Sequence, residues 1–463
     1  MPSLYGLTFL FVLVALVQVL RSGTDPANTS APGYLPLAWV ATAVLVAAFA
    51  IAAFVRRADV RVARGLPWLV GLVAFAVSFV PWLAIYLGNG DLGAAIYKGL
   101  RVPQGIVQFW DLVLPLKSID CASVGVDVYA ANNGCLQDPT IYGPGVLWLK
   151  WVPFDLFSER YVTGFGVVAL VISSVVLLWL ARRAAGLGQI VLLIAAVGGP
   201  WLLLLERGNL DGVLLWGAVA VVIVVGRWDR LWAWWVAAAL IWVLGTWKYY
   251  PFAMGLMLIP ALRLRRGWTV VAGFAAASVL FLALTWDTFR FSAQSNTNMI
   301  DMGDFVVLGR VPVVARMLGT VVGAGGVQLG DALVFLLALV AVAWGVCVGL
   351  SYRRLSVAPA MLASSGGALF LASVVLAGFG WGYKAAFLLL GVPLASWLTR
   401  SARSFLVPSG IVVLSLIAID AVVVWNTVLA TLAGVVAAGF LLGAGVTVLL
   451  RSVRARRPDI VAG

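Results

Sequence analysis

Long apolar runs separated by short polar segments dominate the pattern along the chain. An apolar run of about 17–25 residues can cross a bilayer as a helix, because the hydrocarbon core is roughly 30 Å thick. The pattern predicts an all-α polytopic membrane protein with about 14 transmembrane helices. The predicted spans are 5–20, 36–55, 67–88, 160–181, 188–205, 209–226, 230–247, 250–262, 268–286, 332–351, 358–378, 383–398, 404–424 and 427–450.

The first apolar run also has the length of a secretory signal peptide. It has no basic stretch in front of it, and residues 21–35 contain no clear small-residue cleavage site. We therefore expect residues 5–20 to remain as a membrane span.

The composition agrees with this pattern. Hydrophobic residues make up 63% of the chain, charged residues only 11%, and the mean hydropathy is +1.06. These values exclude soluble enzymes, disordered proteins and fibrous repeats, because an ordinary soluble domain has about 25% charged residues. The chain has no histidine and only 3 cysteines, so neither an imidazole base nor a zinc site is expected. No spacing of acidic residues demands a divalent metal, and the sequence predicts no cofactor.

The net charge is +13, which in a soluble protein would suggest nucleic acid as a partner. Here the arginines cluster after the even-numbered spans, as expected for cytoplasmic loops. The pattern predicts cytoplasmic termini and no nucleic-acid partner. The clusters are Arg56, Arg57, Arg61 and Arg64; Arg182 and Arg183; Arg227 and Arg230; Arg263, Arg265 and Arg266; Arg353 and Arg354; Arg400 and Arg403; and Arg451, Arg454, Arg456 and Arg457.

Two predicted outer segments, 89–159 and 287–331, are much longer than ordinary connections. The first mixes aromatic residues, proline and glycine with charges, which favours short amphipathic helices at the membrane surface. The second is expected either to cover a binding site or to be a plain surface loop. Ordinary polar loops would explain the charges, but they would not explain why the inner loops are short and rich in arginine. We favour a functional outer face.

Cys121 and Cys135 both lie in the first long outer segment. An extracytoplasmic compartment permits disulfides. A bond between them would close a loop of about 15 residues and stabilise it by about 3 kcal/mol. Two free thiols are the alternative.

Three segments at the outer ends of spans combine charged residues with glycine or aromatic residues: ERGNLDG at 206–212, KYYP at 248–251 and GWGYK at 380–384. Each places a cation at the predicted membrane–water boundary. Together these cations could bind a phosphate or pyrophosphate, although a single basic residue at a span end often only snorkels to the interface. The cations are Arg207, Lys248 and Lys384.

Carboxylates in the first long segment are the candidates for a general base, because the chain has no histidine. Sequence spacing alone does not choose among them. They are Asp91, Asp111, Asp120, Asp127 and Asp138.

The same segment carries a series of short motifs: DL at 111–112, SIDC at 118–121, GVDVY at 125–129, NGC at 133–135 and YGP at 142–144. In this order they resemble the first outer loop of polyprenyl-phosphate-dependent glycosyltransferases.

Three later motifs narrow the resemblance. RGNLD at 207–211, KYYP at 248–251 and YK at 383–384 are similar to elements of glycosyltransferase family 87, the alpha-mannosyltransferase-like group of the GT-C superfamily. The resemblance covers roughly residues 105–400. It implies a GT-C type fold, with residues 67–400 as the catalytic core. Residues 1–66 and 401–463 would then be two-span additions, the second with a basic cytoplasmic tail.

The resemblance implies an inverting enzyme that moves a sugar from a polyprenyl-phosphate donor to an extracytoplasmic acceptor. The general base would be Asp111, with Asp120 as the second candidate or as a residue that orients the loop. Asp127 is interpreted as a turn residue. The donor phosphate would be bound by Arg207, Lys248 and Lys384, and the sugar or acceptor by Asn209, Asp211, Tyr249, Tyr142 and Tyr383. The alternative for Asn209 and Asp211 is that they position Arg207.

The implied donor sugar is a mannose-like hexose or a pentose, and the implied acceptor is a glycolipid, an envelope polysaccharide or a protein. The composition is typical of a high-GC prokaryote, which favours the plasma membrane. A transporter or flippase of lipid-linked sugars is the main alternative, but only Asp420 lies well inside a predicted span. A protein that binds lipid-linked sugar without catalysis is a third interpretation.

Overall fold

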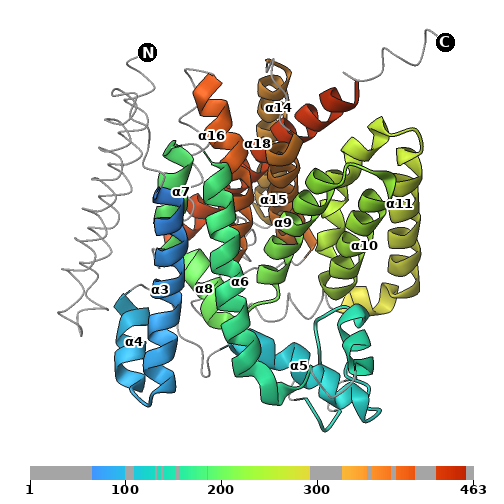
Figure 1. Cartoon of the computed structure of the whole chain (residues 1–463). Coiled ribbons are helices and arrows are strands. Elements are labelled where there is room, and N and C mark those ends of the chain that lie inside the picture. The colour runs from blue at the N-terminus through green and yellow to red at the C-terminus, as the bar shows by residue number, and fades with distance from the viewer. Residues whose placement is uncertain are drawn as a thin grey trace.

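In the computed structural model, the regular secondary structure of the described residues consists of helices (Figure 1). Its described residues are 65–99, 109–130, 133–136, 139–152, 157–184, 186–291, 326–351, 357–376, 382–401 and 424–454. These ranges contain no strand, so the prediction of an all-α protein is confirmed for them. The predicted spans 5–20 and 36–55, almost all of 404–424, and Asp138 and Asp420 lie outside the described residues.

The described helices comprise long apolar segments and shorter ones. The α-helices are α3 (Leu66–Tyr86), α4 (Gly90–Gly99), α5 (Trp110–Ser123), α6 (Val162–Arg183), α7 (Gly186–Ala196), α8 (Gly199–Arg207), α9 (Asp211–Arg227), α10 (Leu231–Lys248), α11 (Gly267–Leu284), α14 (Gly326–Ser351), α15 (Val357–Leu376), α16 (Val392–Ser401) and α18 (Val424–Arg454). The 3-10 helices are η2 (Pro144–Trp151), η4 (Glu159–Tyr161), η5 (Tyr250–Arg263) and η7 (Gly382–Gly391).

Five of the described helices are long and apolar enough to cross a membrane, or six if one bent pair counts as a single span. They include α3, α6, α10 and α11, and the last covers Gly434–Arg454 of α18. Shorter apolar helices occupy Phe335–Ser351, Val357–Ser373 and Tyr383–Leu398. The structure is therefore that of a multi-pass membrane protein by helix length and composition.

The predicted span 188–205 is broken. Helices α7 and α8 meet at an angle of 50°. The sequence Gly198-Gly199-Pro200 lies at the break, where Gly198 is extended and Pro200 occupies the first turn of α8. A proline has no N–H to continue the hydrogen bonds of the preceding helix, which explains why the apolar run does not form one straight helix. The break leaves α8 as a short helix that ends at Arg207.

The C-terminal helix α18 is part of the same helical bundle as the core. It packs along α14 and α15 and also touches η5 and η7 (Figure 1). Helix α3 packs against α6, and α10 lies between α9 and α11.

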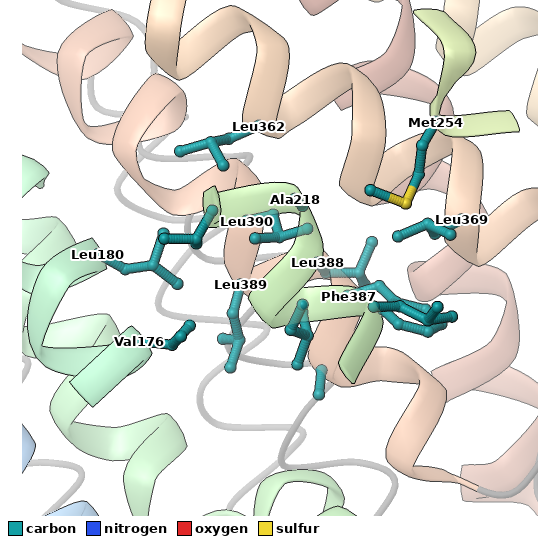
Figure 2. Packing of buried hydrophobic residues seen from close by; sticks show 14 of the residues in the cluster. Val176, Leu180, Ala218, Met254, Leu362, Leu369, Phe387, Leu388, Leu389 and Leu390 are labelled. Atoms are coloured by element: carbon teal, nitrogen blue, oxygen red, sulfur yellow. The ribbon is translucent and has the colours of Figure 1, made fainter. Parts of the chain in front are cut away.

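Helix η7 runs through the middle of the hydrophobic core. Its residues from Phe387 to Leu390 are almost fully buried and touch side chains from several surrounding helices (Figure 2). The segment is therefore enclosed by other helices, and its first residues, Tyr383 and Lys384, are buried with it. The labelled neighbours are Val176, Leu180, Ala218, Met254, Leu362 and Leu369.

The first long connecting segment contains the short helices α4, α5, η2 and η4, as the sequence predicts (Figure 1). A disulfide joins Cys121, near the end of α5, to Cys135. Both cysteines belong to a small separate apolar cluster with Val128 and Leu136. The disulfide and this cluster hold α5 against the loop that follows it. The second predicted segment, 287–331, falls mostly outside the described residues.

Candidate functional site

A tight turn between α8 and α9 brings three polar side chains together. Helix α8 ends at Arg207, and Gly208 follows with φ +60°. A Cβ at this glycine would also lie 2.8 Å from Leu112 Cδ1, so both the backbone and the space favour glycine. Helix α9 then starts at Asp211. Arg207, Asn209 and Asp211 therefore come from one short stretch of backbone.

Lys248 and Tyr250 converge on Asp211 from the turn between α10 and η5. The Lys248 Nζ atom lies 2.6 Å from Asp211 Oδ1, and the Tyr250 hydroxyl donates a hydrogen bond to the same oxygen. The intervening Tyr249 has φ +60°, which is rare for a residue with a side chain. The Asp211 side chain is only 1% exposed, and its Oδ2 atom has no hydrogen-bond partner among the described residues.

Asp111 reaches the same place from the first turn of α5. The Asn209 amide nitrogen donates to Asp111 Oδ2 over 2.6 Å, and Arg207 Nη1 lies 3.6 Å from Asp111 Oδ1. The backbone N–H of Phe109, the residue before α5, donates to the carbonyl of Glu206 over 2.9 Å. This bond fixes the start of α5 beside the end of α8.

Tyr142 connects Asp111 to the disulfide-bonded loop. Its hydroxyl donates to the carbonyl of Asp111 over 3.2 Å, and its own carbonyl accepts from the Tyr129 hydroxyl over 3.0 Å. Its ring also faces Lys248, whose Nζ lies 5.4 Å from the ring centre. The next residue, Gly143, donates its N–H to the carbonyl of Trp247 over 2.7 Å, a close approach that a side chain would obstruct.

The start of η7 closes the site from the core. The Tyr383 hydroxyl accepts a hydrogen bond from the Asn209 amide over 2.8 Å. The Lys384 Nζ atom lies 5.6 Å from the centre of the Tyr250 ring, and this lysine is only 5% exposed. We call the whole set the polar cluster. It consists of Asp111, Tyr142, Arg207, Asn209, Asp211, Lys248, Tyr250, Tyr383 and Lys384.

The polar cluster has one partly open side. The side chains of Asp111, Arg207 and Lys248 keep 15%, 12% and 13% exposure, whereas Asp211 is buried. Burial raises the pKa of Asp111, although Arg207, the Asn209 hydrogen bond and Lys248 all oppose the rise. Burial likewise raises the pKa of Tyr142, which therefore stays neutral. Asp111 is thus a more basic carboxylate than a free aspartate, beside two cations.

Two of the predicted site residues lie outside the polar cluster. Asp120 Oδ2 accepts from the Ser158 hydroxyl over 3.2 Å and from the Glu159 N–H over 2.8 Å, so it holds η4 against α5. The Tyr249 ring packs against Phe281 and Phe289, with ring centres 6.1 and 5.2 Å apart. Each has a structural role that explains its position.

Asp127 and Asp91 also lie outside the polar cluster. Asp127 Oδ1 accepts from the N–H of Tyr129 over 3.0 Å, which is the turn that the sequence suggests. Asp91 is exposed and lies in the first turn of α4. Among the described candidates for a general base, only Asp111 therefore lies beside the cations of the polar cluster.

The structure adds Tyr250 and Glu206 to the residues selected from the sequence. The Glu206 side chain is fully buried, with Oε2 at 3.6 Å from Arg207 Nε. Both residues are adjacent to predicted site residues in the motifs ERGNLD and KYYP. This adjacency is the sequence signal that could have identified them. The described residues contain no group of three or more cysteine, aspartate or glutamate side chains that could hold a metal ion.

These observations define an all-helical, multi-pass membrane protein with a buried polar cluster at the ends of several helices. No protein-family model matches the chain, and no characterised protein or solved structure matches it either. The function is therefore argued from the site.

Proposed function

We propose that the protein is a glycosyltransferase of the GT-C type, related to glycosyltransferase family 87. It moves a sugar from a polyprenyl-phosphate donor to a glycolipid, polysaccharide or protein acceptor. One observation carries the proposal. On the partly open side of the cluster, the partly exposed carboxylate of Asp111 lies 3.6 Å from Arg207. A transferase with a phosphate leaving group needs both of these charges close together.

In the proposed reaction Asp111 accepts the proton of the acceptor hydroxyl. The hydroxyl oxygen forms a bond to the anomeric carbon while the bond from that carbon to the phosphate oxygen breaks, which inverts the configuration. The electron pair leaves with the lipid phosphate, and Arg207 and Lys248 stabilise its charge. Lys384 is more deeply buried and adds positive charge next to Tyr250, which bonds to Asp211.

The placement of arginines supports an extracytoplasmic site. Helices α9 and η5 each have a cluster residue at the start and an arginine at the end, Arg227 and Arg263. Helix α10 has the reverse order, with Arg230 before it and Lys248 at its end. By the positive-inside rule the arginine ends face the cytoplasm and the polar cluster faces outward. We accordingly propose about 14 spans in the plasma membrane, with both termini cytoplasmic.

The direct test is sugar transfer by the purified protein in proteoliposomes. Radiolabelled polyprenyl-phosphate sugars would be offered with a lipid and glycan extract of the source cells. We expect transfer by the wild type and a fall of about 10²–10⁴-fold in Asp111→Asn, the usual contribution of a general base. Asp91→Asn makes the same change at an exposed residue of α4 and should transfer normally.

The alternatives give different results. Loss of transfer in Asp120→Asn but not in Asp111→Asn would move the base to Asp120. Movement of lipid-linked sugar across the bilayer without transfer to any acceptor would favour a flippase. Donor binding with neither transfer nor movement would favour a non-catalytic binding protein.

A further inference from the structure

The side-chain amide of Asn209 uses every hydrogen-bonding capacity that it has. A side-chain amide has two N–H donors and one oxygen with two lone pairs. The Nδ2 atom donates to Asp111 Oδ2 over 2.6 Å and to the Tyr383 hydroxyl over 2.8 Å. The Oδ1 atom accepts from Lys248 Nζ and from the Asp211 N–H, each over 2.9 Å. No capacity is left for a substrate.

The neighbours also fix which way the amide points. The Lys248 ammonium and the Asp211 N–H are both donors, so they require an oxygen opposite them. A flipped amide would direct its own N–H groups at these donors and its oxygen at the Asp111 carboxylate. The ion pair of Lys248 with Asp211 therefore holds Asn209 in the one orientation that directs a donor to Asp111.

We infer that Asn209 is a positioning residue that holds the Asp111 carboxylate ionised and correctly turned, and that it does not contact the sugar. This inference rests on the proposed function, in which Asp111 is the base. It differs from the prediction from sequence, which assigned Asn209 either to sugar or acceptor binding or to the positioning of Arg207. Asn209 is buried, with only 6% of the residue exposed.

Several charged and polar groups act on the ionisation of Asp111. The Asn209 amide and Arg207 both favour its ionised form, and Lys248 does so from α10. Asp211 on α9 opposes ionisation. The Tyr142 hydroxyl donates to the Asp111 carbonyl, and the Tyr383 hydroxyl accepts from the Asn209 amide. Of these groups, Asn209 makes the short direct hydrogen bond to the carboxylate, so its loss should raise the pKa of Asp111.

The sharpest test replaces the donor by an acceptor of the same shape. In Asn209→Asp an oxygen would face Asp111 Oδ2 at hydrogen-bond distance, and the two carboxylates would share a proton. We expect the acidic limb of the pH–rate profile to move up by at least about one pH unit. At neutral pH kcat should fall while KM for the polyprenyl-phosphate sugar stays within a few-fold. Asn209→Ser removes the same donor with less disturbance and should give a smaller shift in the same direction.

The protonation of Asp111 can also be followed without any activity. Difference infrared spectroscopy would titrate the carboxylic-acid band that disappears in Asp111→Asn. This band should titrate at higher pH in Asn209→Asp and Asn209→Ser. Asn133→Asp is the matched control, because Asn133 accepts turn hydrogen bonds from Cys135 and Leu136 outside the cluster, and it should leave the band unchanged.

The outcomes separate the two proposals. An unchanged infrared midpoint in both Asn209 variants would overturn the positioning role. A raised KM with an unmoved acidic limb would assign Asn209 to the sugar instead. A shifted midpoint in a protein without transferase activity would leave the positioning of Asp111 intact and overturn the proposed function.

Discussion

The two ends of α10 carry very different ion pairs. At its end, Lys248 pairs with Asp211 inside the polar cluster, where the Asp211 side chain is 1% exposed. Just before its start, Asp229 pairs with Arg263 of η5 over 2.5 Å, and the Asp229 side chain is 40% exposed. The indole N–H of Trp234 donates to Asp229 over 3.3 Å. We call this second site the Arg263 clamp.

The two sites differ in how many charges they bury, and this difference bears on their roles. The Arg263 clamp joins the turn before α10 to the last residue of η5, and one partly exposed pair suffices for that purpose. The polar cluster buries several charges drawn from α5, α8, α9, α10 and η7. Burying charges is unfavourable, and apolar residues of similar size would often stabilise a fold equally well or better. The cluster is therefore better explained by function than by stability.

The largest expected effect on stability comes from removing one partner of the buried ion pair between Lys248 and Asp211. Lys248→Ala leaves Asp211 without its closest cation and should lower the free energy of unfolding by about 3–5 kcal/mol. Thermal unfolding in detergent would measure the loss. The double variant Lys248→Met with Asp211→Leu should recover much of it, because no charge is then left unpaired. An unfolding temperature unchanged by Lys248→Ala would show that the pair is not buried as described.

The disulfide should have the next largest effect. Cys121→Ser opens a loop of about 15 residues and should destabilise it by about 3 kcal/mol. Hydrogen exchange should become faster in α5, and transfer should fall because the Tyr129 and Tyr142 contacts that reach Asp111 loosen. Cys347→Ser changes a free cysteine on α14 and is the matched control. Equal exchange rates in the two variants would contradict this account of the loop.

The smallest effect is expected at the Arg263 clamp. Arg263→Ala removes a partly exposed pair and should change the free energy of unfolding by about 1 kcal/mol or less. Transfer should stay near the wild-type rate, because the clamp lies at the opposite end of α10. A loss as large as that of Lys248→Ala would remove the distinction between the two sites.

Much of the polar cluster could be predicted because its residues stand at the ends of apolar runs. Arg207, Lys248 and Lys384 were each visible as a cation beside a glycine, an aromatic residue or a proline. Their convergence follows from the helices, which bring span ends on one side of the bundle together. The resemblance ranks Asp111 first among the candidate acids for the general base. In the structure Asp111 lies beside the cations of the polar cluster.

The rest depended on backbone geometry that sequence patterns do not carry. Which of two adjacent tyrosines joins the cluster is decided by the positive φ of Tyr249, which turns Tyr250 toward Asp211. The bend between α7 and α8 depends on how Pro200 and its glycines fold. The role of Asp120 required its distant partners, Ser158 and Glu159. Long-range pairing of this kind is invisible in a single sequence.

The central claim is that the polar cluster is a catalytic site with Asp111 as its base. The most direct measurement compares donor binding with sugar transfer in wild type and Asp111→Asn, across a pH series. The account predicts donor binding within a few-fold of wild type and transfer reduced by about 10²–10⁴-fold. Wild-type transfer should fall as the pH drops through the raised pKa of Asp111, because only the carboxylate can accept the proton. Transfer by Asp111→Asn at the wild-type rate would contradict the claim.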